Sequence, residues 1–472
     1  TISAAIGGAF NLYIDGSGNI TTSAVFAASA LSITKQGSGT FTVTGANLYT
    51  GATRVDAGAL AYAATTTLVA TNLTVNGGIF SNGANADTIG TVTLVGGTIS
   101  NSAALTGTAY TLESGTVSGI LAGAIAVTKN TNNTVNLTGV NTISSTLTIN
   151  GGTVAISGSG SAVSVTAITV NLGGTLTLDN TTTAVASRLG DAIVLTMHGG
   201  NFNFIGNSAA ASSETTGQLA LASGHNVVTV TPGAGGSTTM TFASNPGFNR
   251  TAGATVLFRG TNLGSTPAAN VSTLMFTTTP TLTGAAGAAN SSTISVIKGA
   301  FGDSSLSGTG SDMVTYNVGN SNGLRLLNGA GFSGEYSATL TTNTNVKLTA
   351  NTAASTVSIN SLITNTFDIT NASATITMGS ASLAANILIN STDDIAGANT
   401  TIAFSTLELS ILATANSTIS AILNTAAAGP LTLSGSGNVT FSAANAYTGT
   451  TTVNNATLTA GASNVISSGA VT

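Results

Sequence analysis

Short stretches in which apolar and polar residues alternate recur along the chain at a nearly constant spacing. Each copy begins with a turn residue, usually followed by Thr or another small residue, and continues as a strand such as Phe41-Thr42-Val43. The turn residues that open the first nine copies are Gly39, Gly58, Gly78, Gly97, Gly115, Asn133, Gly152, Gly174 and Gly200. Their successive spacings are 19, 20, 19, 18, 18, 19, 22 and 26 residues, and a 19-residue spacing returns between Asn438 and Thr457. A repeat of about 19 residues predicts a β-solenoid with one copy per coil.

The alternation also predicts which side chains line the core. Successive side chains of a strand point to opposite faces, so the apolar positions of each copy are expected to point inward and the Thr positions outward. The residues expected to point inward include Phe41, Val43, Val135, Leu137, Leu176 and Leu178. Two or three short strands are expected in each coil. Gly and Asn at the corners are suited to the positive φ that tight turns require.

The regularity of the repeat divides the chain into three predicted parts. Residues 1–204 are predicted to form a regular solenoid, residues 205–330 a less regular solenoid with insertions, and residues 331–472 a solenoid again. Four of the five prolines fall in the middle part, between residues 232 and 280. If the whole chain joined one ladder, about 20 to 25 coils spaced about 4.8 Å apart would form a rod on the order of 100 Å long.

Composition excludes several classes of partner. Only 5% of the residues are charged, with nine Lys and Arg against fourteen Asp and Glu, for a net charge of −5. Nine scattered cations cannot form the basic stripe that nucleic acid or an acidic membrane surface requires, so neither is an expected partner. The longest nearly apolar run, residues 119–127, is too short to span a bilayer. Cysteine is absent, so disulfides play no part in stability.

Two segments at opposite ends of the chain share a motif. Residues 37–60 read GSGTFTVTGANLYTGATRVDAGAL, residues 435–458 read GSGNVTFSAANAYTGTTTVNNATL, and 12 of the 24 aligned positions are identical. The Asn-x-Tyr-Thr-Gly centre lies at 47–51 in the first copy and at 445–449 in the second. Both segments resemble the autotransporter-associated β-strand repeat, also called the passenger-associated transport repeat. The resemblance implies a right-handed parallel β-helix on a bacterial surface and does not imply an activity.

The sequence offers no clear site for chemistry, and no catalytic, cofactor-binding or metal-binding residue is predicted. The fourteen acids are dispersed, whereas glycoside hydrolysis needs a pair of carboxylates in one cleft. The one adjacent pair, Asp393-Asp394, is interpreted as a solvated turn, with a Ca²⁺ site as the alternative. His198 and His225 are the only imidazoles, and no Gly-x-Ser-x-Gly nucleophile elbow occurs. His198 is expected to be a solvated side chain at a corner.

Tyr49 and Tyr447 occupy equivalent positions in the two motif copies. One interpretation is structural, in which each ring packs against neighbouring coils or caps a corner. The alternative is a platform on which a sugar stacks.

The predicted function is that of a non-enzymatic extracellular structural protein. Neither end carries a charged capping segment, and both carry the same repeat, so the last coil of one chain could pair with the first coil of the next. The expected partner is therefore a second copy, joined end to end in a surface fibre or matrix. An adhesin stalk that binds glycans or a host surface through residues 205–330 is the alternative. A β-helix enzyme that processes polysaccharides is a third hypothesis.

Overall fold

The fold is known from a computed structural model, which describes residues 4–63, 71–317, 321–379, 385–392, 394–397, 399–404, 406–425, 428–466 and 468–472. Within these residues the protein is all-β and has no helix. The chain forms two compact units. Unit 1 comprises Thr1–Leu195 with Glu214–Gly217, and unit 2 comprises Thr196–Ser213 with Gln218–Thr472. The three-part division expected from the sequence remains a prediction.

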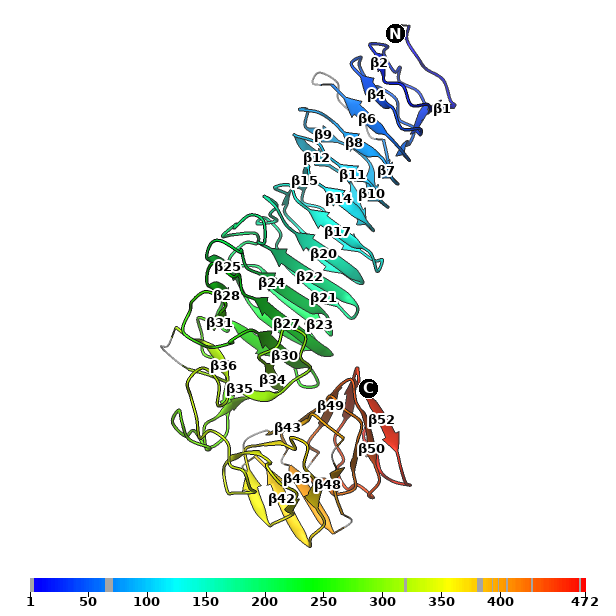
Figure 1. The fold of residues 1–472 in the computed structure, drawn as a ribbon. Coiled ribbons are helices and arrows are strands. Elements are labelled where there is room, and N and C mark those ends of the chain that lie inside the picture. Colours follow the sequence, from blue (N-terminus) through cyan, green and yellow to red (C-terminus); the bar gives the residue numbers. More distant parts are fainter. Residues whose placement is uncertain are drawn as a thin grey trace. The chain divides into compact units, whose positions relative to one another are not determined.

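Unit 1 is a stack of parallel coils, and Figure 1 shows its rungs following one another in chain order from blue to green. Its first sheet contains, in order, β1 (Asn11–Ile14), β3 (Ser32–Lys35), β5 (Thr53–Val55), β7 (Leu73–Val75), β10 (Thr91–Leu94), β13 (Ala109–Leu112), β16 (Val127–Lys129), β19 (Thr146–Ile149) and β21 (Ala167–Asn171). Its second sheet contains β2 (Ile20–Thr22), β4 (Thr40–Val43), β6 (Ala59–Tyr62), β8 (Ile79–Ser81), β11 (Thr98–Ile99), β14 (Gly115–Val117), β17 (Thr134–Leu137), β20 (Gly152–Ile156) and β22 (Gly174–Asp179). A third, shorter sheet contains β9 (Asp87–Thr88), β12 (Ala104–Thr106), β15 (Ile120–Gly123) and β18 (Thr142–Ile143).

The register of these ladders confirms the predicted parallel β-helix and its coil length. Thr40 pairs with Ala59, 19 residues further along, and Thr134 pairs with Thr153 at the same spacing. The spacing of turn residues does not give every register. It would place Thr116 beside Thr134, whereas Thr116 lies beside Asn136. The shift of two residues keeps Val117 and its neighbours on the same face, because side-chain direction repeats every two residues.

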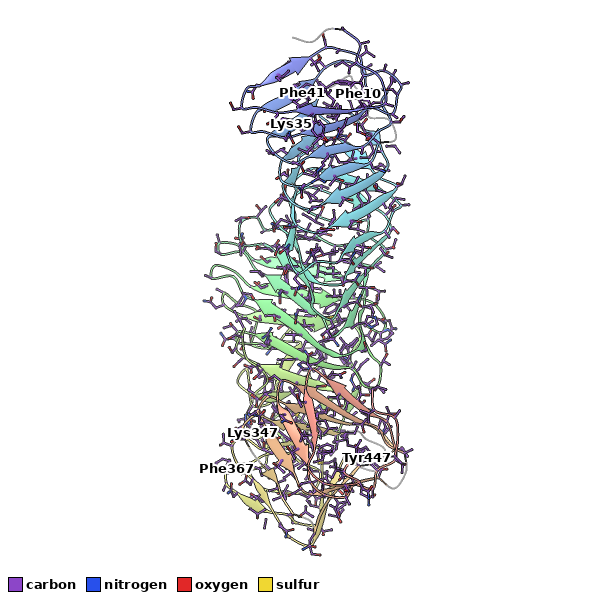
Figure 2. All side chains as sticks on the ribbon, turned by 90° about the vertical axis from the view of Figure 1, so that its right-hand side faces the viewer. Phe10, Lys35, Phe41, Lys347, Phe367 and Tyr447 are labelled. Carbon is purple, nitrogen blue, oxygen red and sulfur yellow. The ribbon has the colours of Figure 1, made fainter. Side chains whose placement is uncertain are left out.

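The core of unit 1 is a set of in-register columns of inward side chains. All six residues expected to point inward are buried. Two lysines interrupt an aliphatic column: Lys35 stands between Ile14 and Val55, and Lys129 stands beside Ile149. Figure 2 labels Lys35 and Phe41 among the blue rungs.

Each of the two buried lysines places its ammonium group at a corner of its coil. Lys35 Nζ donates to the carbonyl oxygens of Gln36 at 2.6 Å and Gly37 at 2.7 Å. Lys129 Nζ donates to carbonyl oxygens of Thr131 and Gly151. Burial lowers the pKa of both lysines. Corner carbonyls thus take the place of a carboxylate partner.

Unit 2 begins with further parallel coils. Its strands in this part are β24 (Asn201–Ile205), β26 (Leu219–Ser223), β27 (His225–Thr231), β28 (Thr238–Phe242), β29 (Phe248–Arg250), β30 (Thr255–Gly260), β31 (Ser272–Phe276) and β34 (Ala300–Asp303). Parallel pairs join β24 to β27, β27 to β30, β30 to β34, β26 to β29 and β28 to β31. Two further strands, β23 (Val194–His198) and β25 (Ser212–Thr216), contain residues of both units.

Antiparallel pairs then interrupt the ladder, so the condition that the whole chain joins one ladder is not met in the described residues. β35 (Asp312–Tyr316) pairs antiparallel with both β34 and β36 (Leu324–Leu326), and β32 (Leu282–Thr283) pairs antiparallel with β33 (Val296–Ile297). An antiparallel strand reverses the chain direction, so it cannot serve as the next parallel rung.

New parallel coils form the C-terminal part of unit 2. One sheet contains β37 (Asn345–Lys347), β40 (Ser361–Ile363), β43 (Ala385–Ile389), β46 (Leu409–Ala413), β49 (Leu431–Gly435) and β51 (Thr451–Asn454). A second contains β38 (Thr352–Ala353), β41 (Ile369–Thr370), β44 (Asp394–Ile395), β47 (Ser417–Ile419), β50 (Asn438–Phe441) and β52 (Thr457–Ala460). A third contains β39 (Val357–Ile359), β42 (Ala374–Met378), β45 (Thr400–Phe404) and β48 (Ile422–Thr425).

The sheet that contains β43 and β46 is buried on both faces. Its inner face contributes residues such as Ile387 and Ile411 to the core of the C-terminal coils. Its outer face contributes Leu388 and Leu412 to a second core, which they share with Leu257 on β30. The C-terminal coils are therefore packed against the earlier part of unit 2.

Candidate functional site

The two motif copies adopt the same local structure around their tyrosines. The Tyr49 hydroxyl shares a hydrogen bond with Thr53 Oγ1 at 2.5 Å, and the Tyr447 hydroxyl shares one with Thr451 Oγ1 at 2.8 Å. Both rings are 1% exposed, so neither can act as a sugar-stacking platform. The structural interpretation is correct, and burial raises the pKa of Tyr49 to about 12. Figure 2 labels Tyr447 in the C-terminal coils.

The motif glycines are required because the coils approach each other closely. A Cβ atom at Gly51 would lie 2.2 Å from the carbonyl oxygen of Leu31, and a Cβ at Gly449 would lie 2.2 Å from the carbonyl oxygen of Gly429. A van der Waals contact needs well over 3 Å, so only glycine fits at this corner. The Tyr-Thr-Gly sequence is thus a stacking element that allows one coil to lie directly on the next.

The first coil leaves strand edges that no described residue pairs with. β1 and β2 each end their sheet. Ser32 N donates to Phe10 O and Gln36 N donates to Ile14 O, so the alternation of a parallel ladder turns the backbone groups of Tyr13 toward the free side. The Tyr13 side chain is 61% exposed and that of Phe10 is 47% exposed. Figure 2 labels Phe10 near the N-terminus.

The last coil has a matching free edge at β52. Thr457 N donates to Gly437 O and Gly461 N donates to Phe441 O, so the N–H of Ala460 faces away from β50. Leu458 extends the column of the fully buried Val439 but is itself only half-buried. Beside β52, residues 470–472 already begin a further rung on β51, because Thr451 N donates to Ala470 O.

The two edges differ in charge. The last charged residue of the chain is Glu408, so the coil that contains β52 carries no charge, whereas the exposed Asp15 lies between β1 and β2 in the first coil. A motif copy lies at the last edge and another lies beside the first. β51 and β52 correspond to β5 and β6, which stand two strands in from β1 and β2 in their sheets.

The buried charges of the chain have structural partners, and sequence reasoning did not pair them. Arg325 and Glu335 form a fully buried ion pair at 2.7 Å. Arg188 donates to Gly160 O at 2.6 Å and to Asn180 Oδ1 at 2.6 Å. Glu408 joins Arg250 across unit 2. The sequence signal that could have found these groups is the rarity of charge in an apolar chain, since such residues are seldom buried without partners.

Glu214 is the carboxylate whose proton affinity burial changes most clearly. It accepts hydrogen bonds from the backbone N–H groups of Arg188 at 2.8 Å and Leu189 at 3.0 Å. Burial outweighs these bonds and raises the pKa of Glu214 to about 7. Its oxygens hold the backbone that follows the β22 corner, which is a structural role.

The two histidines lie apart and have hydroxyl partners. His198, expected to be a solvated side chain at a corner, is partly exposed, and its Nδ1 lies 3.0 Å from Ser223 Oγ. His225 Nδ1 lies 2.9 Å from Thr255 Oγ1, and burial, with a smaller effect of Arg259, lowers the pKa of His225 to about 4. Asp393 of the proposed turn lies outside the described residues. Among the described residues, no group of three or more His, Asp or Glu side chains is arranged to hold a metal ion.

The stacked parallel coils define the class of the protein as a β-solenoid. The family model for the passenger-associated-transport-repeat matches residues 33–61 and 431–460, so the chain carries two copies of this repeat. The repeat indicates an extracellular, autotransporter passenger-type protein. Comparisons with curated proteins and with solved structures found no significant match. No helical segment of the described residues has the length and hydropathy of a membrane span.

Proposed function

We propose that this chain is a non-enzymatic structural protein of the bacterial exterior, which assembles end to end into a surface fibre or matrix. One observation carries the proposal: among the described residues, β1 and β2 at one end and β52 at the other pair with a strand on one side only, and copies of one repeat lie in or beside these edges. A rung of similar cross-section could extend either edge with backbone hydrogen bonds. Pairing the last coil of one copy with the first coil of the next uses two different surfaces, so the assembly continues as a filament.

The side chains at the edges favour the same assembly. Leu458 on the last coil and Tyr13 on the first leave apolar surface in water. A further rung would bury this surface, and the burial would stabilise the assembly by about 25 cal/mol for each Å² of apolar surface. The absence of charge within fifteen residues of β52 removes the usual repulsion between stacked edges.

Electron microscopy and sedimentation of the purified chain over a range of concentrations test the proposal. We expect filaments that lengthen with concentration. Tyr13→Lys places a charge on the first edge, and Ala460→Pro removes the N–H that faces the free side of β52. Each variant should raise the concentration needed for assembly by at least about tenfold.

The matched control is Leu172→Lys, because Leu172 is 63% exposed and lies on the side of unit 1 rather than at a free edge. This variant should assemble as the parent chain does. Monomers at every concentration, or filaments that both edge variants leave unchanged, would refute the end-to-end proposal.

An adhesin that binds glycans is the second candidate. The observation that favours it is a cation-lined pocket in unit 2, which does not involve the strand edges.

A further inference from the structure

A pocket of about 320 Å³ opens beside β29 in unit 2. It is lined by Phe248, Asn249, Arg250, Ala252, Thr281, Thr283, Ile297 and Lys298. The volume lies at the lower end of the range for small-molecule sites, which suits one sugar ring. Two separate parts of the sequence line the pocket. One is β29 with the turn after it, and the other contains the antiparallel strands β32 and β33.

The pocket contains two cations that share one carboxylate. Arg250 and Lys298 both lie beside Glu408, at 2.8 Å and 3.7 Å. No other carboxylate of the described residues lines the pocket or pairs with either cation, so two positive charges face one negative charge. Elsewhere in the described chain, Arg54, Arg325 and Lys347 each have a carboxylate of their own. The pocket therefore keeps a net positive charge in a protein whose total charge is −5.

Hydrogen-bond donors remain available at this charge. Arg250 uses Nε for the carbonyl of Ala254 and Nη2 for Glu408 and Ser410, and no described group accepts a hydrogen bond from its Nη1. Lys298 Nζ lies 3.7 Å from Glu408 Oε2, at ion-pair distance. An anion at this point would receive charge-assisted hydrogen bonds from both side chains.

The Arg250 guanidinium is held in place before any ligand arrives. A Cβ atom at position 299 would lie 2.2 Å from Arg250 Nε and 2.4 Å from Cζ, so the glycine at that position makes room for the group. Glu408 fixes its other side, because the carboxylate is 1% exposed and also accepts a hydrogen bond from Gly253 N at 2.9 Å. Pre-organised donors lose little conformational freedom on binding.

The remaining walls suit a sugar ring rather than a bare ion. Phe248 contacts Phe276 and Phe258, with ring centroids 5.5 Å and 6.3 Å away, so its ring orientation is fixed. Aromatic faces stack on the C–H face of a pyranose, while Asn249 and Thr281 offer exposed amide and hydroxyl groups for its ring hydroxyls. We propose that this pocket binds a carboxylated sugar, a hexuronic acid, either free or as a residue of an acidic polysaccharide.

Titration calorimetry with galacturonic and glucuronic acid tests the proposal on the whole chain. Binding of at least one of the two acids is expected, and it should weaken at high salt. The methyl ester of the same sugar and the neutral hexose should bind at least about tenfold more weakly, because they lack the charge. Equal binding of acid and ester, or no binding of either acid at millimolar concentration, would overturn it. Acetate or inorganic phosphate binding as tightly as the sugar acid would overturn the sugar assignment.

Variants locate the site. Lys298→Met should weaken uronic acid binding by about tenfold or more. Phe248→Leu should weaken binding of the sugar acid but not any residual binding of acetate. Arg54→Met, which removes an exposed cation in unit 1, is the matched control and should bind as the parent chain does. A Lys298→Met variant with a parental melting curve and parental affinity would refute the site.

One further ligand, a trimer of the sugar acid, separates the sources of the sugar. A trigalacturonate that binds more tightly than the monosaccharide assigns the pocket to a polysaccharide, whereas a trimer that binds only as well assigns it to the free acid or a chain end. Both results keep the hexuronic acid site. These measurements are made below the concentration at which filaments form, so their outcome is independent of the assembly experiment.

Discussion

Arg250 and Glu408 lie 158 residues apart in the sequence, yet Arg250 Nη2 stands 2.8 Å from both carboxylate oxygens of Glu408. The pair joins the end of β29 to the turn before β46, and Asn454 Nδ2 donates to Gly253 O beside it at 2.6 Å. The repeat pattern alone does not predict this contact within unit 2. It attaches the C-terminal coils by their outer sheet face.

Removing the charge of Glu408 should weaken this attachment strongly. Glu408→Gln leaves the Arg250 guanidinium buried without its anion, which costs about 3 kcal/mol of unfolding free energy. Denaturant unfolding and hydrogen exchange at β29 and β46 measure the effect. The double variant Arg250→Met/Glu408→Met should recover most of the loss, because an apolar pair needs no counter-charge. A double variant as unstable as Glu408→Gln would contradict this explanation.

The attachment should also depend on pH. Burial alone would raise the pKa of Glu408, but Arg250 and the hydrogen bond from Thr432 hold it below its usual value of 4.5. A carboxyl with a lowered folded-state pKa stabilises the fold above its unfolded pKa, and this stability is lost as pH falls through the folded value. The protection of the β46 amides against hydrogen exchange, measured relative to the intrinsic exchange rate at each pH, should therefore decrease below about pH 4.5 in the parent chain. Glu408→Gln should show no such step.

The close approach of the coils predicts that Gly→Ala substitutions destabilise the fold strongly at some positions and hardly at others. Gly51→Ala and Gly449→Ala should each lower the unfolding free energy by on the order of 2 kcal/mol or more, because the new Cβ meets a carbonyl oxygen of the coil below. Gly18→Ala is the control, since a Cβ at that position meets nothing within 4 Å. Thermal unfolding of the three variants measures the effect. Equal melting temperatures would show that the coils can separate without cost.

Much of unit 1 could be predicted because two periods reinforce each other. The alternation of Phe41, Thr42 and Val43 identifies the inward side chains, and the 19-residue spacing places each column above the last. The register at β17 could not be predicted, because a shift of two residues preserves the alternation that the sequence displays. The sequence identifies the motif tyrosine but allows two interpretations of its role, because the motif does not show whether the ring is buried.

The attachment of the C-terminal coils and the sugar pocket could not be predicted from periodicity. Both depend on residues of unrelated coils, such as Arg250 and Glu408, and no spacing connects them. One signal was present in the strands themselves. β43 reads Ala-Asn-Ile-Leu-Ile and β46 reads Leu-Ser-Ile-Leu-Ala, and the consecutive apolar residues in each indicate a strand buried on both faces.

Glu214 should make unit 1 more stable as the pH falls toward 4.5. Its folded-state pKa is about 7, whereas the usual pKa of a glutamate is 4.5, so the folded chain binds the extra proton between these values. The unfolding free energy should then decrease by about 3 kcal/mol as the pH rises from 4.5 to 7. Exchange of the Arg188 and Leu189 amides, which donate to this carboxyl, provides a local measurement. A Glu214→Gln chain with the same pH slope would assign the effect elsewhere.

His225 should have the opposite effect in unit 2. Its pKa falls from 6.5 to about 4 on folding, so the unfolded chain binds the extra proton between these values. Stability of unit 2 should therefore decrease as the pH falls from 6.5 toward 4. His225→Gln should flatten this dependence when exchange is followed at β27 and β30. Retention of the parental slope in the variant would exclude His225 as its source.

The enclosed lysines have a practical consequence for anyone who tries to see this protein. Lys35 and Lys129 are at most 1% exposed, whereas Lys298 and Lys347 expose about a quarter of their side chains. Amine-reactive dyes, biotin esters and aldehyde fixatives therefore have lysine targets in unit 2 and none in unit 1. An image made with such reagents would therefore show lysine labels in unit 2 and no lysine labels in unit 1.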